Sequence, residues 1–187
     1  MIKLCQELDI DEKKIKLHDD GTPLFGAYYV EAQAKAAFNK QVWLKSGGFL
    51  IIEQTEACVG IDVNTGKYTG KADLGRTILK TNLEAAEEIA HQLRLRNLNG
   101  MIIVDFIDMK SEQDRQAVQK KLEEAVAKDS LQTIVVGMTE LGLMQLTRKK
   151  KRESIMHLMT RPCPCCGGSG RVSISEDIKY HGNNNLS

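Results

Sequence analysis

Two aspartates follow apolar runs that are typical of buried strands. Asp62 comes after "CVGI" and Asp105 comes after "MIIV". Ligand sites in α/β sheets gather at the carboxyl ends of strands, so two strands that end side by side would bring these carboxylates together. Carboxylates at close range repel each other unless a cation lies between them. Mg²⁺ suits such a place because it prefers oxygen ligands and retains water, and Mn²⁺ suits it as well.

Asn64 lies two residues after Asp62, so both side chains point to the same face of an extended strand. The amide of Asn64 could then orient the carboxylate of Asp62. A metal held there could supply a bound water as nucleophile and could polarise a phosphoryl oxygen. The simpler alternative is that both aspartates cap turns at strand ends, and the spacing alone favours that alternative.

Three of the five cysteines lie in the segment "CPCCGG" at 163–168. Cys163 and Cys166 have the CxxC spacing of a zinc knuckle, in which proline and glycine shape the turn. A structural zinc needs four ligands, and the sequence holds no second CxxC. Three interpretations follow: the same motif of a second subunit closes the site, the pair is redox-active, or the motif is idle.

The elements that must position these residues are predicted from hydrophobic periodicity. From residue 49 onward the pattern predicts the order β-β-α-β-α-β, an α/β sandwich with a mixed sheet. Capping boxes or caps are expected at Thr81 with Glu84 and at Ser111 with Asp114. The predicted elements are a helix within 24–44, two strands within 49–64, a helix at 81–97, a buried central strand at 100–109, a helix from 111 to about 128 and a strand at 132–138. The expected core positions of the two longer helices are Ala86, Ile89, Ala90, Leu93, Ala117, Leu122, Ala125 and Val126.

The composition is that of a globular protein, with 42% hydrophobic and 27% charged residues and a formal charge of +1. Five consecutive cations at 148–152 form either a solvated surface or a phosphate-binding segment. No stretch approaches the roughly 18 apolar residues of a membrane helix, and the N-terminus lacks an apolar signal core. We therefore expect a cytoplasmic protein. The polar tail at 173–187 is expected to be disordered.

Three segments together resemble the catalytic region of the ribonuclease E/G family of bacterial endoribonucleases. They are "WLKSGGFLIIEQTEACVGIDVNTGKYTG", "ILKTNLEAAEEIAHQLRLRNLNGMIIVDFIDM" and "RPCPCCGGSGR". The resemblance covers about residues 24–172 in unbroken order. It implies part of a ribonuclease H-like subdomain at 1–48, a deoxyribonuclease I-like mixed-sheet catalytic subdomain at 49–160 and a zinc-link at 161–172.

The resemblance also implies an activity: Mg²⁺-dependent hydrolysis of single-stranded RNA that leaves 5′-phosphate products, in RNA processing or decay. Asp62 and Asp105 match the family's magnesium-binding aspartates, and Asn64 matches the asparagine that supports the first. Cys163 and Cys166 match the zinc-link cysteines, which share one Zn²⁺ between protomers and imply a homodimer or a larger assembly. The candidate RNA contacts besides the 148–152 run are Lys67, Lys71, Arg94 and Arg96, for which an ordinary surface role is the alternative.

The sequence also departs from the full-length family pattern. From the resemblance, we expect the chain to lack an N-terminal OB-type RNA-binding domain, a pocket for the RNA 5′ end and a dimerisation domain after the zinc-link. We therefore expect a catalytic fragment that cleaves RNA poorly alone, because the stacking and backbone contacts of an OB-type domain are absent. The alternatives are a non-catalytic RNA-binding module and a zinc-linked assembly element.

Overall fold

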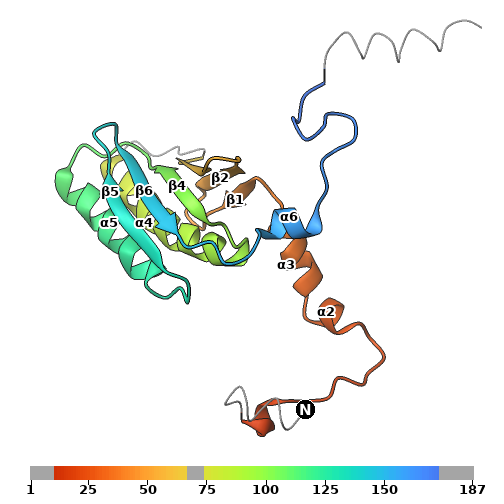
Figure 1. Cartoon of the computed structure of the whole chain (residues 1–187). Helices are drawn as coiled ribbons and strands as arrows, with labels where there is room; N and C mark the ends of the chain where they lie inside the picture. Colours follow the sequence, from red (N-terminus) through yellow and green to blue (C-terminus); the bar gives the residue numbers. More distant parts are fainter. Residues whose placement is uncertain (1–10, 67–73, 173–187) are drawn as a thin grey trace, which may run out of the picture. The chain divides into compact units, whose positions relative to one another are not determined.

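The computed structural model describes residues 11–66 and 74–172 (Figure 1). The chain divides into two compact units, Met1–Asn39 and Lys40–Ser187. Lys67, Lys71 and the tail at 173–187 lie outside the described residues. No helix within the described ranges is long and apolar enough to span a membrane.

The first unit contains short helical elements. They are η1 (Glu12–Lys14), α2 (Leu24–Ala27) and α3 (Val30–Ala36). The helix expected within 24–44 is confirmed and corresponds to α3. Tyr29 separates α2 from α3 and has a left-handed φ of 57°, which breaks the helix between them. The ribonuclease H-like assignment of this part stays a prediction.

The second unit is built on a six-stranded mixed sheet with the order β1-β2-β3-β4-β6-β5. The expected mixed α/β fold is therefore confirmed. β3 and β4 pair in parallel, and the other neighbouring strands pair antiparallel. The strands are β1 (Gln41–Trp43), β2 (Phe49–Gln54), β3 (Val59–Asn64), β4 (Gly100–Asp105), β5 (Thr133–Met138) and β6 (Leu143–Arg148).

Two helices, α4 (Leu74–Leu95) and α5 (Glu112–Val126), lie along one face of the sheet (Figure 1). Strand residues alternate between the two faces, and every second one joins the core beneath these helices. All four core positions expected on α4 are buried, as are Leu122, Ala125 and Val126 of α5. The prediction that Ala117 is a core position is wrong, because Ala117 is exposed and Val118 is buried instead. The core of the sheet consists of Leu50, Ile52, Val59, Ile61, Val63, Ile102, Val104, Met144 and Leu146.

The opposite face carries the alternate residues of the same strands, which are exposed or half-buried. Ile51, Asp62, Ile103 and Asp105 belong to it. We call this side of the sheet the exposed face. Because one face is packed and the other meets solvent, a polar side chain at the end of β3 or β4 can be displayed without being buried.

The predicted capping box at Thr81 is wrong. α4 begins at Leu74, and Thr81 lies inside the helix with 2% of its surface exposed. Glu84 instead accepts hydrogen bonds from the backbone amides of Lys45 and Ser46, which lie between β1 and β2. By contrast, the cap at Ser111 is confirmed, because its hydroxyl accepts from the amide of Asp114. Two strands, β1 and β6, were not predicted.

After β6 the chain forms a short helix, α6 (Ile155–Met159), capped by the side chain of Ser154. The backbone amide of Ile155 donates to the carbonyl of Arg96 at the end of α4. Residues 160–172, which contain the cysteine segment, then continue without regular helix or strand.

Candidate active site

Asp62 and Asp105 are brought together by the parallel pairing of β3 and β4, in which they are direct partners. Both strands end at this edge of the sheet, as the sequence predicted. Both carboxylates are exposed and line a hollow on the exposed face, together with Ile51, Glu53 and Ile103. Within the described part of the chain, no group of three or more acidic, histidine or cysteine side chains is arranged so that it could hold a metal ion by itself. Because both carboxylates are exposed, the acidic pair is accessible from the solvent side.

Asn64 holds the first of these carboxylates. Its Nδ2 donates a hydrogen bond of 2.8 Å to Oδ2 of Asp62. The amide therefore lies on the same face and orients the carboxylate, as the spacing predicted. Because Oδ2 of Asp62 accepts this hydrogen bond, Oδ1 of Asp62 keeps its lone pairs available for another partner.

The end of β3 is fixed by close packing against the turn at Gly47 and Gly48. A Cβ atom on Gly48 would lie 2.6 Å from the carbonyl oxygen of Asn64. A Cβ atom on Gly66, whose φ is +67°, would lie 2.2 Å from the carbonyl oxygen of Gly47. No side chain fits at either place. The turn between β1 and β2 therefore also lets two backbone segments meet beside the site.

Asn82 fixes the chain directly after Asp105, and sequence reasoning did not find it. The residue is fully buried on α4. Its Nδ2 donates to the carbonyl of Ile107 at 2.8 Å, and its Oδ1 accepts from the amide of Ile107 at 3.1 Å. One amide side chain thus satisfies both backbone groups of a residue that has left the sheet. The available signal was an asparagine within the apolar helix pattern, three residues before Ala85.

The two candidate RNA-contacting arginines lie elsewhere. α4 runs from the end of β3 back to the start of β4, so its last residues lie at the opposite end of the strands from Asp105. Arg94 is exposed there and donates to the carbonyl of Ala125. Arg96 is buried, and its Nε donates to Oε1 of Gln92 at 2.6 Å. The structure therefore does not bring either arginine to the acidic pair, and an RNA contact at each stays a prediction.

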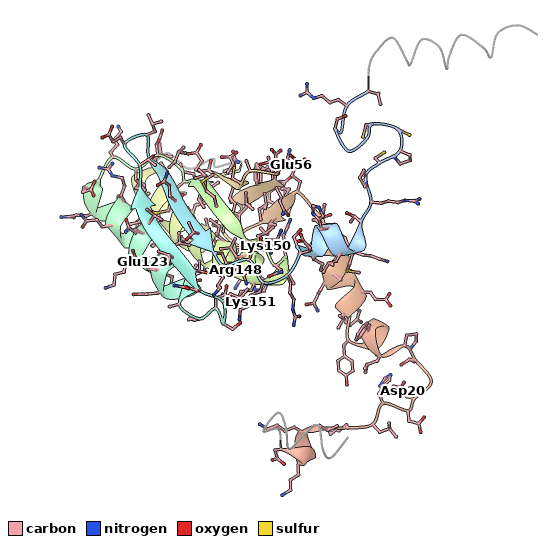
Figure 2. All side chains as sticks on the ribbon, viewed as in Figure 1. Asp20, Glu56, Glu123, Arg148, Lys150 and Lys151 are labelled. Carbon is pink, nitrogen blue, oxygen red and sulfur yellow. The ribbon has the colours of Figure 1, made fainter. Side chains whose placement is uncertain are left out.

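The basic run at 148–152 is not uniform. The Arg148 side chain is only 3% exposed and forms an ion pair with Asp129, its Nε lying 2.7 Å from Oδ2. Its Nη1 also donates to the carbonyl of Leu98 at 2.9 Å. Figure 2 labels Arg148 together with Lys150 and Lys151 of the same run. The run was predicted as a surface or phosphate-binding segment, and for Arg148 that is wrong: it is the last residue of β6 and faces the helices. Residues 149–152 are exposed, and Lys150 pairs with Glu153.

Asp129 is held in its charged form. Burial by itself would raise its pKa, but the hydrogen bond and charge of Arg148 and a hydrogen bond from the amide of Leu131 lower the pKa below its ordinary value of 3.8. This ion pair ties the start of β5 to the end of β6. It is a structural feature at the end of the sheet away from the acidic pair.

The cysteine segment presents three thiols on one short turn, of which Cys163 and Cys166 form the CxxC pair. Cys163 is exposed and Cys166 is half-buried. The amide of Gly170 donates to Sγ of Cys166 at 3.3 Å, and hydrogen bonds from Gly170 and Gly168 lower the pKa of this thiol. The described residues of one chain thus bring together two thiols with CxxC spacing, which leaves the three interpretations of the motif open.

The fold and site define a mixed α/β protein with paired carboxylates at the ends of two parallel strands. The profile of the Ribonuclease E/G family matches residues 1–151. Ribonuclease G of Haemophilus influenzae is 48% identical over 89% of this chain and 34% of its own length, and Ribonuclease G of Escherichia coli K12 is 47% identical over the same shares. Ribonuclease E of Escherichia coli K12 is 41% identical over 88% of this chain and 16% of its own length. The chain belongs to the ribonuclease E/G family.

The chain spans about a third of the length of the ribonuclease G relatives that it matches. The family assignment made from the three motifs is confirmed.

Proposed function

We propose that this chain carries the catalytic part of an endoribonuclease that hydrolyses phosphodiester bonds of single-stranded RNA with Mg²⁺ and leaves 5′-phosphate products. The observation that carries the proposal is the direct pairing of Asp62 with Asp105, with Asn64 bound to Asp62, in a chain of this family. In the same proposal, 49–160 is the deoxyribonuclease I-like subdomain and 1–48 is part of a ribonuclease H-like one. The setting is cytoplasmic RNA processing or decay.

The donor set fits a hard divalent cation. Asp62 and Asp105 present carboxylate oxygens from neighbouring strands into a solvent-exposed hollow. Two carboxylates leave most positions of an octahedral ion for water and a phosphate oxygen, which is the usual pattern for Mg²⁺. When bound, the ion would activate water and stabilise negative charge on the phosphate. Mn²⁺ has the same ligand preference.

The residues of the chain would orient this chemistry. Asn64 fixes the rotation of the Asp62 carboxylate through its hydrogen bond. Asn82 fixes the backbone that follows Asp105. Ile51 and Ile103 line the hollow beside the carboxylates. The site is thus held from α4 and from the strand ends, which are rigid elements.

Product chemistry tests the proposed reaction. The purified chain is incubated with a single-stranded, AU-rich oligonucleotide and Mg²⁺, and the products are treated with an exonuclease that requires a 5′-phosphate. We expect the downstream fragments to be degraded. Fragments that resist until a kinase adds phosphate would contradict hydrolysis in this direction. RNA binding without any fragments would favour the alternative, a non-catalytic RNA-binding module.

The cysteine segment is proposed to hold half of a zinc site. Cys163 and Cys166 of two copies would supply four thiolates, the usual number for structural zinc, and would join the copies into a homodimer. Support comes from the CxxC spacing and from the exposure of this segment. The competing candidate is a zinc-linked assembly element without catalysis.

Native mass spectrometry with added Zn²⁺ tests this zinc-link. Cys163→Ser and Cys166→Ser should each abolish a dimer that holds one zinc ion. Cys165→Ser is the matched control and should leave it intact, because Cys165 lies outside the CxxC pair. A dimer that survives in both ligand variants would refute the proposal.

A further inference from the structure

Trp43 is exposed on the same face of the sheet as the acidic pair. It is the sole tryptophan of the chain, and 67% of its surface meets solvent. Val42, its neighbour in β1, packs against the core, so the alternation of the strand directs Trp43 to the exposed face. Most of this large aromatic side chain is left uncovered by the described unit, so its surface is accessible to a ligand.

Trp43 is part of an aromatic pair. Its ring centroid lies 5.3 Å from that of Phe49 on β2, with an angle of 61° between the ring planes. Phe49 alternates with the fully buried Leu50, so it also belongs to the exposed face. The edge contact with Phe49 restricts the rotation of the indole, while most of its surface stays accessible.

The strand register connects this pair to the acidic residues. Trp43 is the partner of Phe49, and Phe49 is the partner of Asn64. The three side chains therefore form a row across β1, β2 and β3, and Asn64 bonds to Asp62. Neighbouring strands lie about 4.8 Å apart, so Trp43 lies roughly 10 Å from Asn64 across the sheet. About three stacked nucleotides of a single strand span that distance, given about 3.4 Å per nucleotide.

We propose that Trp43 and Phe49 form a stacking platform for a nucleobase of single-stranded RNA whose phosphodiester lies at Asp62 and Asp105. The inference rests on the proposed function, because the proposed function is what identifies single-stranded RNA as the ligand. Three acidic side chains line the hollow, Asp62, Asp105 and Glu53. Of these, Glu53 forms an ion pair with Lys40. Stacking of a base on an aromatic ring adds affinity without charge and tolerates any base, so it suits a nuclease site of negative charge.

Fluorescence of Trp43 tests the platform directly, because no other tryptophan contributes. The full chain is titrated with an oligonucleotide of ten adenosines at low salt with Ca²⁺ in place of Mg²⁺, so that a hard cation is present at the acidic pair, and the oligonucleotide is checked to be intact at the end. A matched ribose-phosphate oligomer without bases is the control for charge. We expect the RNA to quench the emission and the abasic oligomer to leave it unchanged. Three results would each overturn the proposal. They are equal quenching by both oligomers, no quenching although anisotropy shows that the RNA binds, and no RNA binding at all.

Variants give the second measurement. Trp43→Leu should weaken RNA binding by at least about fivefold, the lower end of the stacking contribution, whereas Trp43→Phe should retain most of it. Ile134→Ala is the matched control, since Ile134 is a half-exposed apolar residue on the edge strand β5 at the other side of the sheet. Circular dichroism checks that each variant is folded. Equal binding by Trp43→Leu and the wild type contradicts the platform.

The outcomes separate this inference from the proposed function. Quenching by RNA in a chain that never cleaves would keep the platform and reject the nuclease. Mg²⁺-dependent cleavage with an unchanged KM in Trp43→Leu would keep the nuclease and reject the platform. A shift of the emission with protein concentration in the absence of RNA would show that a second copy covers Trp43, which also rejects it.

Discussion

Asp62 and Asp105 are direct partners in the parallel pair formed by β3 and β4. Parallel strands end at the same edge of a sheet, so this pairing places both carboxylates on one side of the molecule. It requires a crossover between the strands, which α4 supplies. The long helix thus has two tasks: it forms the core, and it returns the chain so that the second aspartate stands beside the first.

The hydrogen bond from Asn64 to Asp62 predicts a specific loss of function. Asn64→Ala frees the Asp62 carboxylate to rotate, and we expect metal affinity or activity to fall by about 10–100-fold, the usual effect of removing a group that orients a metal ligand. A Mg²⁺ titration of cleavage measures it. Thr65→Ala is the control, because the Thr65 hydroxyl bonds to the carbonyl of Gly66 and not to Asp62. Equal titration curves for Asn64→Ala and the wild type would refute the orienting role.

Asn82 is expected to matter for stability and for the site together. Asn82→Ala leaves the amide and carbonyl of Ile107 without their partners, at a cost of about 1–3 kcal/mol for each group that stays buried. Urea unfolding measures the loss, and cleavage should fall as the chain after Asp105 loosens. Asn99→Ala is a control from the other end of the sheet, where Asn99 bonds to Arg152. If Asn82→Ala lowers the stability no more than Asn99→Ala does, the hydrogen bonds between Asn82 and Ile107 are dispensable.

Gly66 should not tolerate a side chain. Gly66→Ala places a Cβ at 2.2 Å from the carbonyl oxygen of Gly47 and holds alanine at a φ of +67°. The left-handed backbone alone costs about 1–2 kcal/mol, and the contact forces the turn beside Asn64 to move. Gly75→Ala is the matched control, because its Cβ would meet nothing within 4 Å. Thermal unfolding should separate the two variants clearly, and equal melting temperatures would contradict the close approach.

The core and the element order from β2 to β5 could be predicted because they depend on short-range periodicity. The same alternation that buries Ile61 and Val63 exposes Asp62, so the strand signal and the site signal coincide. Asn64 was found for the same reason, since two residues on one strand share a face. Family motifs then gave the protein class, which the comparisons confirm.

Other features could not be predicted because they depend on distant partners. Arg148 belongs to a run of cations in sequence, and only the pairing of β6 with β4 and β5 turns it towards Asp129. Arg96 is hidden by packing, although the sequence around it is polar. Thr81 followed by Glu84 matches a cap, but the helix already begins at Leu74 and Glu84 bonds to the turn after β1. Asn82 acts on Ile107, which lies 25 positions away.

The ion pair of Asp129 with Arg148 predicts a dependence of stability on acid. Asp129 has a pKa below 3.8 in the folded protein, so the unfolded chain binds more protons once the pH falls towards that value. Its contribution is present above about pH 4 to 5 and is lost as the pH falls through the folded pKa. Asp129→Asn should cost about 3–5 kcal/mol near neutral pH, because Arg148 is left buried without a counter-ion.

Unfolding of the wild type and Asp129→Asn over a series of pH values measures this effect. The difference in stability between them should shrink in acid. The double variant Asp129→Leu with Arg148→Met removes both charges and should recover much of the loss. A difference that stays constant with pH would show that the pair is not ionised in the way we describe.

The most direct test of the account is the dependence of RNA cleavage on Mg²⁺ in the wild type, Asp62→Asn, Asp105→Asn and Asp108→Asn. Asp108 is an exposed aspartate three residues past Asp105, outside the strand, and serves as the matched control. The account predicts Mg²⁺-dependent cutting of a 5′-labelled single-stranded oligonucleotide by the wild type and Asp108→Asn, and none by the other two. Cutting that survives in Asp62→Asn or Asp105→Asn would contradict it, as would an absence of cutting by the wild type.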